Sequence, residues 1–297
     1  MQRTARLGVS RMRFAEMRDG YVFILPQMIL FAVFTVIPVF EGVRISLYDS
    51  SFMGDFFVGF ENYRTLLTDP VFLKAVLNTL VYVVSVTALT VGLGFLIAAA
   101  IFDKNPKYVS FIRCCYYLPT IIGMAVLSLI WLWLLNPSYG LINYYLQRLG
   151  IAPINFVGDA RTRIPVIIFM IWLVNIGQSV MLLVASMSSI PNEMFEAADI
   201  DGASRFQQIR YIVAPLSKST VVYLTILMII SVIKVFSVIH LMTAGGPNYA
   251  TVSMMYLSYL EAFKFFDYGT GSAIGVIMFI IVWALSMVIL AVTSKKE

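Results

Sequence analysis

Charged residues are scarce in this chain: Asp, Glu, Lys and Arg together make up 12% of its 297 residues, whereas 60% are hydrophobic. Soluble globular domains carry about 25% charged residues, because a folded surface in water needs them. A chain of this length could bury a large soluble core, but it has too little charge to cover one. The composition therefore excludes an ordinary soluble protein and indicates an integral membrane protein.

Residues and motifs that carry enzyme chemistry are also sparse. The single histidine, His240, cannot anchor a multi-histidine metal site, and the two cysteines, Cys114 and Cys115, are adjacent and have no metal-ligand spacing. The sequence contains no Gly-Lys pair, hence no phosphate-binding P-loop, and neither His-Glu-x-x-His nor Gly-x-Ser-x-Gly occurs. We therefore expect no catalytic residues, no metal and no cofactor in this chain.

Long apolar runs are what the sequence has in abundance. A helix needs about 20 apolar residues to cross a hydrocarbon layer about 30 Å thick. The runs do not alternate as barrel strands do, so we predict an all-α polytopic membrane protein with six transmembrane helices in one domain, 21–297, after a basic N-terminal extension, 1–20. The expected spans are about 21–47, 76–102, 110–135, 165–187, 221–242 and 271–292.

The distribution of Lys and Arg predicts the orientation of these spans. With the N-terminus in the cytoplasm, thirteen of these residues fall in inner segments and six in outer ones. The positive-inside rule therefore favours a cytoplasmic location for both termini. Three arginines, Arg148, Arg161 and Arg163, lie in an outer connection against the rule, without reversing it. Topology thus accounts for the net charge of +5, and we expect no nucleic-acid partner.

One connection between two spans, residues 189–218, is unusually polar for this chain. Four carboxylates fall within nine positions: Glu193, Glu196, Asp199 and Asp201. The segment must therefore lie in water, and the predicted orientation places it in the cytoplasm. Pro191 suits the first turn of a helix, and Gly202 suits a turn because glycine accepts positive φ. We expect two short helices, about 191–200 and 203–213, which form either a docking surface or a polar pair lying on the membrane.

The residues of this loop also follow a pattern of fixed distances. Eight of them define it: Glu196, Ala197, Ala198, Asp201, Gly202, Ala203, Ile212 and Pro215. This order resembles the coupling loop of the membrane subunits of binding-protein-dependent ABC importers. Ile209 and Ala214 stand where Phe and Leu are usual, and both stay apolar. The resemblance implies a type I ABC importer transmembrane-domain fold in which an ATPase subunit docks on the 189–218 loop.

Further segments resemble the sugar-importer branch of that family, the maltose- and glycerol-3-phosphate-type permeases. They include Gly59-Phe60-Glu61-Asn62-Tyr63, Asn78-Thr79-Leu80, Tyr117-Leu118-Pro119, Asn136-Pro137 and Thr243-Ala244-Gly245-Gly246-Pro247. The resemblance implies four kinds of protein partner or ligand: a second permease subunit, two ATPase subunits that bind ATP and Mg, an extracytoplasmic solute-binding protein and a carbohydrate substrate. It also implies a multi-pass protein in the lipid of the cell (inner, cytoplasmic) membrane.

Polar side chains inside the expected spans are candidates for a transport path, because burying them in hydrocarbon is costly. Asn175, Gln178 and Ser179 share one face of the fourth span, and Lys234 lies inside the fifth. Side chains of this kind could bind a sugar by hydrogen bonds. They could equally bond to neighbouring helices, and Lys234 could extend its ammonium group to the membrane surface.

Two other function classes remain open. An ion-gradient-driven secondary transporter would need intramembrane carboxylates or broken helices in an inverted repeat, and the expected spans hold no central Asp or Glu. A receptor or scaffold leaves the Glu-Ala-Ala loop without a role. The prediction is therefore a permease subunit of an ATP-driven carbohydrate importer, not an enzyme, which forms half of a translocation path and works by alternating access.

Overall fold

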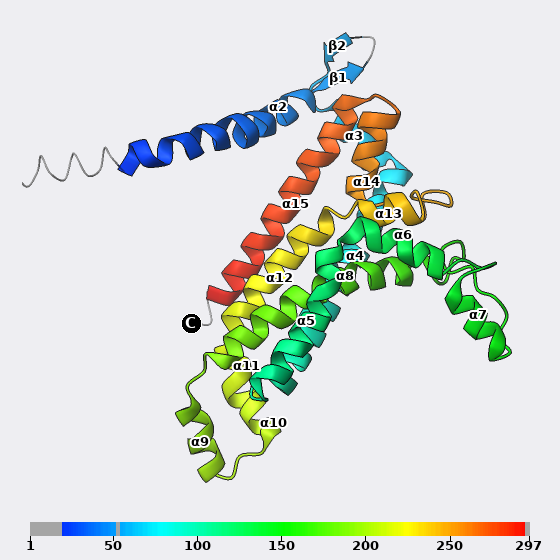
Figure 1. The fold of residues 1–297 in the computed structure, drawn as a ribbon. Helices are drawn as coiled ribbons and strands as arrows, with labels where there is room; N and C mark the ends of the chain where they lie inside the picture. The colour runs from blue at the N-terminus through cyan, green and yellow to red at the C-terminus, as the bar shows by residue number, and fades with distance from the viewer. Residues whose placement is uncertain (1–19, 52–53, 295–297) are drawn as a thin grey trace, which may run out of the picture.

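The protein is a helical bundle with one long helix that extends away from it (Figure 1). The computed structural model describes residues 20–51 and 54–294, so the basic extension, apart from Gly20, lies outside the described residues. Five helices in this part of the chain are long and apolar enough to cross a membrane, or six if a bent pair counts as one span. They are Gly20–Ile45, Pro70–Ile101 (α4), Arg163–Ser188 (α8), Lys218–Met242 and Tyr268–Ala291, which lies within α15 (Tyr268–Ser294). The all-α fold class is confirmed.

The centre of the bundle is α8, which packs against α4, against α5 (Pro106–Ile122) and against α12 (Lys218–Ile233). Close approach of α5 and α8 depends on Gly177: a Cβ there would lie 2.3 Å from the carbonyl oxygen of Tyr116. Small residues at such crossings let helix backbones approach, which is how helices associate where lipid removes the hydrophobic driving force. The tightest apolar packing lies around Tyr82, Met170 and Val232, each fully buried.

The region of the third expected span, 110–135, consists of two helices and not of one straight helix. The chain forms α5 and then α6 (Met124–Leu134), with a bend of 94° between them. Gly123, at φ +84, ends α5, and Pro119 inside its last turn has no N–H to donate. A proline removes one helical hydrogen bond and a glycine accepts the left-handed conformation, so the two together break the helix.

A second interruption lies inside the fifth span. α12 ends at Ile233 and α13 (Ser237–Met242) begins after three non-helical residues, of which Lys234 is the first. The hydroxyl of Ser253 donates a hydrogen bond to the carbonyl oxygen of Val235, at 2.9 Å. Backbone groups freed at membrane depth need such partners, and the serine supplies one.

The end of the bundle opposite the 189–218 loop is closed by loops bonded to the first half of α4 (Figure 1). The amide of Asn78 donates to the carbonyl oxygens of Ala250 and Val252, at 3.1 and 3.0 Å, and the Tyr82 hydroxyl donates to that of Thr251, at 3.0 Å. Two family-like segments that are far apart in the sequence, 78–80 and 243–251, are thereby joined. Short helices outside the long spans include α3 (Glu61–Thr68), α7 (Leu141–Arg148), α14 (Met254–Tyr259) and η3 (Leu260–Lys264).

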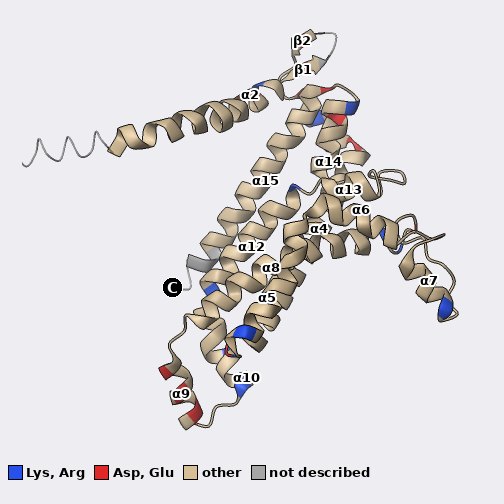
Figure 2. Cartoon of the chain, in the orientation of Figure 1, with Lys and Arg blue, Asp and Glu red and all other residues tan. Residues whose placement is uncertain are grey.

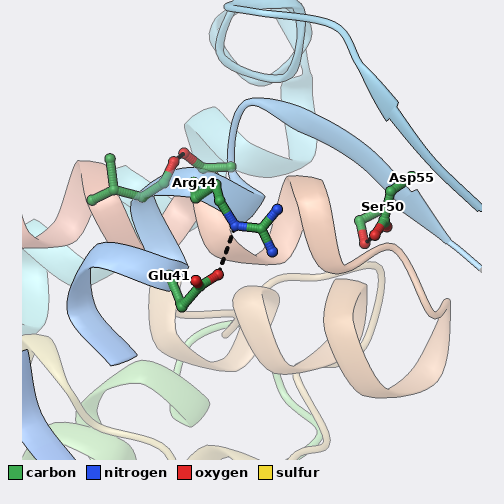
Figure 3. A network of polar contacts seen from close by, with 6 residues as sticks. Glu41, Arg44, Ser50 and Asp55 are labelled. Carbon is green, nitrogen blue, oxygen red and sulfur yellow. Dashed lines mark hydrogen bonds and ion pairs between the residues drawn. The ribbon is translucent and has the colours of Figure 1, made fainter. Parts of the chain in front are cut away.

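The first span lies apart from the bundle. It includes the π-helical stretch η1 (Ala32–Val36) and α2 (Ile37–Ile45), and its apolar window is 0% buried. It contacts α15 near its end, where it continues into a hairpin of β1 (Tyr48–Ser51) and β2 (Gly54–Phe57). Figure 3 shows Arg44 beside Glu41, with Nε 2.7 Å from the carboxylate, and Ser50 beside Asp55 in the hairpin. These polar contacts mark the point where the apolar helix ends.

Most of the charge lies toward the two ends of the bundle, with further basic residues on α7 and at the upper end of α12 (Figure 2). The long helices are almost without charge along most of their length, whereas the end opposite the hairpin carries the acidic residues of α9 (Asn192–Ile200) and a basic residue of α10 (Arg205–Gln208). The same end holds η2 (Ile209–Val213) and α11 (Ala214–Leu216). The 189–218 loop thus projects beyond the apolar helices.

Candidate functional site

The first helix of the 189–218 loop, α9, has one face on the bundle and one in solvent. Phe195 and Ala198 are its half-buried residues, and the phenyl ring of Phe195 lies 5.7 Å from that of Phe102 (centroid to centroid). The three carboxylates of the helix, Glu193, Glu196 and Asp199, are exposed. This is the amphipathic pattern of a surface helix, with Glu193 and Glu196 turned outward, whereas Asp199 accepts a hydrogen bond from Gln208 and lines the cleft behind the helix.

A tight turn follows, and the predicted turn at Gly202 is confirmed. Gly202 has φ +75, its N–H donates to the Asp199 carbonyl at 3.1 Å, and the Ala203 N–H donates to the Ala198 carbonyl at 2.9 Å. These two bonds form a Schellman motif, which satisfies carbonyls at the end of the helix. No atom of the described residues lies within 4 Å of the position a Cβ would take on Gly202, so conformation and not packing requires glycine here.

The second helical segment begins at Arg205, two residues later than predicted. Ser204 caps it, because its side chain accepts from the Gln207 N–H while the Gln207 side chain accepts from the Ser204 N–H. The segment then runs without a break through η2 and α11 to Leu216, so Pro215 continues the helix and does not start a new element. The wide π-helical turn just before Pro215 accommodates a residue that cannot donate a hydrogen bond.

The loop exposes apolar side chains that sequence reasoning missed. Ile200 is 87% exposed and Phe206 69% exposed, and Tyr211 and Met194 are exposed as well. Of the eight pattern residues, Ala198, Ala203 and Ile212 are half-buried and the other five are exposed. The sequence signal that could have identified the exposed apolar side chains is an apolar residue at a water-facing position of a polar loop. Such side chains, beside exposed carboxylates, are typical of a protein interaction surface.

Two of the four path candidates lie on one polar strip. The Asn175 amide donates to the Ile171 carbonyl at 2.7 Å, and its oxygen lies 3.5 Å from the hydroxyl of Ser231 on α12. Ser231 is exposed, and Lys234, three residues further on, is exposed too, at the end of α12. We name Asn175, Ser231 and Lys234 the polar strip. Ser231 was missed because a single serine in an apolar run carries little information.

The other two candidates do not belong to this strip. Ser179 is fully buried against Gly94 of α4, whose added Cβ would lie 3.1 Å from the serine Cβ. Its hydroxyl has no hydrogen-bond partner among the described residues. Gln178 is half-buried beside it on α8. The shared helical face is therefore divided between an open part at Asn175 and a closed helix contact at Ser179.

In the part of the chain that the structure describes, no group of three or more His, Cys, Asp or Glu residues could hold a metal ion. The two cysteines are free and exposed.

The geometry agrees with three comparisons. Residues 90–295 match the model of the family described as binding-protein-dependent transport system inner membrane component. A probable ABC transporter permease protein, YurN of Bacillus subtilis, is 34% identical, covering 93% of this chain and 97% of its own. The trehalose/maltose transport system permease protein MalF of Thermococcus litoralis is 33% identical, covering 95% and 96%. A crystal structure of a bacterial ABC transporter involved in alginate import is 22% identical, with a TM-score of 0.86, covering 96% and 99%, and shows the same fold.

Proposed function

The chain belongs to the family of binding-protein-dependent transport system inner membrane components, and from that premise we propose that it is the membrane-spanning permease subunit of an ATP-driven carbohydrate importer. It is a transport subunit and not an enzyme. Carbohydrate as the substrate class is supported by the trehalose/maltose permease among its relatives. The family description supports a solute-binding protein as the partner that delivers the substrate.

The exposed surface of the 189–218 loop is the single observation that carries this proposal. Ile200 and Phe206 flank the Gly202 turn and hold apolar side chains in water at the tip of the bundle. Leaving them exposed costs free energy that a docked protein recovers, because burial stabilises by about 25 cal/mol per Å² of apolar area. We assign this surface to an ATPase subunit. ATP and Mg bind to that partner, and this chain supplies the docking surface.

The polar strip is the proposed contribution of this chain to the translocation path. A sugar exchanges its bonds to water for bonds to amide, hydroxyl and ammonium groups, and the strip presents one of each on α8 and α12. Ser231 and Lys234 are exposed, so the strip is open to one side of the bundle. A second permease subunit completes the path on that side, and this chain forms half of it.

Orientation follows from the docking surface. ATP is a cytoplasmic ligand, so the 189–218 loop, and with it both termini, lies in the cytoplasm of a cell whose inner membrane holds the protein. The hairpin and the loops that close the opposite end then face the solute-binding protein. In each cycle the ATPase subunits move the loop, and the bundle passes between two states that differ in partner contacts, which alternating access requires.

Purification in mild detergent from the cells that make the protein tests the assignment. The expected complex contains a P-loop ATPase and a second permease. In vesicles with the solute-binding protein added outside, it takes up sugars from a labelled panel only when ATP is enclosed with the ATPase. Phe206→Ser should release the ATPase, whereas Phe263→Ser, an exposed phenylalanine of η3 near the opposite end, should not. A chain that transports alone on a proton or sodium gradient contradicts the proposal and supports a secondary transporter.

A further inference from the structure

One side chain links the 189–218 loop to a different turn of the protein, the connection between α4 and α5. Arg205, the first residue of α10, places its Nη2 atom 3.1 Å from a carboxylate oxygen of Asp103 and donates a hydrogen bond to the Ala99 carbonyl, also at 3.1 Å. Its guanidinium carbon lies 4.7 Å from the centroid of the Phe102 ring. Three groups of one turn are therefore held by one arginine from the loop.

Each of these contacts has a physical reason. The carbonyl of Ala99 is among the last four of α4, which have no partner within the helix, and the negative end of the helix dipole favours a cation there. The planar guanidinium can donate to the carboxylate and the carbonyl while its face lies on a ring, which a lysine cannot do. The ion pair itself is 40% and 39% exposed on its two sides, so its contribution to stability is small. The link fixes geometry more than it stabilises the fold.

Apolar packing also joins the loop to the end of α4, because Ile190, Phe195 and Val213 belong to one cluster with Ala98, Ile101 and Phe102. A polar cleft of about 450 Å³ lies between them, lined by residues of both, among them Asp103, Asp199 and Arg205. Beside it, the ring of Phe195 lies against that of Phe102, and the Ser188 hydroxyl donates to the Phe102 carbonyl at 3.4 Å. The polar contacts across this cleft are few, and Arg205 makes the ion pair, a hydrogen bond and a ring contact there.

We propose that Arg205 is a positioning residue that makes the docking loop and the α4–α5 turn move as one unit. The chain itself connects the loop to α8 and α12, and apolar packing places it against α4 and α5. Arg205 adds directed contacts that fix the loop to the end of α4 and to the turn that leads into α5. A force applied to the loop by an ATPase then displaces all four helices together. This inference rests on the proposed function.

Distances between two spin labels test the link in the assembled complex. Labels at Lys104→Cys and Glu193→Cys, both exposed, report on the turn and on the loop, in a chain whose free cysteines are replaced by Cys114→Ser and Cys115→Ser. Spectra are recorded in vesicles at rest and after trapping with ATP and vanadate. With Arg205 present we expect one narrow distance that does not change on trapping.

The expected result for Arg205→Met is a broad distance distribution that shifts on trapping, with the ATPase still bound. Arg210→Met is the matched control, because Arg210 lies on the same loop, is exposed and contacts the ring of its neighbour Tyr211; it should leave the distance narrow. If Arg205→Met fails to assemble, Arg205→Lys must broaden the distance distribution, since lysine keeps the positive charge but lacks the planar set of donors of the guanidinium.

Two results overturn the link: a narrow, unchanged distance without the arginine, or a distance that changes on trapping in the chain that keeps it. Failure of the proposed function is distinct, because then no ATPase is recovered with the unmodified chain.

Discussion

The conformation of Gly202 leads to a graded prediction about ATPase docking. Its φ of +75 is left-handed, and in the part of the chain that the structure describes no atom lies within 4 Å of an added Cβ. A residue with a side chain therefore meets no clash inside the chain but favours a different backbone conformation. The left-handed conformation costs an L-residue about 1–2 kcal/mol, whereas Asn tolerates it better than most.

The conformational strain lowers the affinity for the ATPase if the ATPase binds only the left-handed conformation of the turn. A binding-competent fraction that falls through strain raises the apparent Kd in proportion, so a strain of about 1–2 kcal/mol raises it by at most roughly 5- to 30-fold. We expect the order Gly202, Gly202→Asn, Gly202→Ala, Gly202→Val from tightest to weakest. Val comes last because a β-branched residue is least compatible with positive φ. ATP hydrolysis that no longer depends on the solute-binding protein should accompany the weaker docking.

The measurement is the binding of the purified ATPase subunit to the permease in lipid nanodiscs, followed by the rate of ATP hydrolysis. The order of Asn and Ala separates two explanations. Backbone strain penalises Ala more, whereas a partner that presses on Gly202 penalises the larger Asn more. Weaker binding for Gly202→Asn than for Gly202→Ala, or equal binding for all four chains, refutes the reasoning from φ.

Three further predictions concern packing, protonation and the path. Gly177→Ala should lower the Tm in detergent, because overpacking costs about 1–3 kcal/mol. Gly92→Ala should not, because no atom of the described residues lies within 4 Å of the added Cβ there. Equal melting temperatures for the two variants contradict the close approach of α5 and α8. Burial raises the pKa of the Glu261 carboxyl group, and nearby carboxylates raise it further. The folded chain therefore holds the carboxyl proton more tightly than the unfolded chain does, and stability declines as the pH rises from the unfolded-state pKa through the folded-state pKa. Glu261→Gln should flatten the decline of Tm with pH, and an unchanged slope argues against a contribution of the Glu261 proton to stability. Lys234→Met should impair uptake in vesicles while leaving ATPase binding intact, and normal uptake removes Lys234 from the path.

The first residue of α4 could be predicted from local helix-start residues, although not from the apolar run alone. The apolar run predicted a beginning near residue 76, but the helix begins at Pro70, because Asp69 accepts hydrogen bonds from the N–H groups of Val71 and Phe72. An Asp followed by Pro is a recognised helix start. Local chemistry of this kind is predictable from sequence, as the turn at Gly202 was.

The break at Gly123 was predictable in part. Pro119 and Gly123 both stand in the sequence, yet membrane helices tolerate either residue alone, since neighbouring groups satisfy the freed backbone. Whether the helix bends depends on what packs on either side of it. The 94° bend is therefore a property of the bundle as well as of these two residues.

Contacts between distant segments were beyond the reach of sequence patterns. Ser179 and Asn175 lie one helical turn apart, and only the position of α4 determines that one is buried and the other open. Arg205 was counted among the inner positive charges, with no indication of its partner Asp103, about a hundred residues earlier in the chain. Periodicity identifies a face of a helix, but not the element that covers it.

Crosslinking from the loop tests the central claim, docking of an ATPase at the Gly202 turn, most directly. A photoreactive amino acid replaces Ile200, which is 87% exposed, and in a parallel chain it replaces Phe263 near the opposite end. After irradiation of native membranes, the captured protein is identified by mass spectrometry. A P-loop ATPase should be captured from position 200 and not from position 263. Capture of lipid alone at position 200, or equal capture of the ATPase from both positions, contradicts docking at the Gly202 turn.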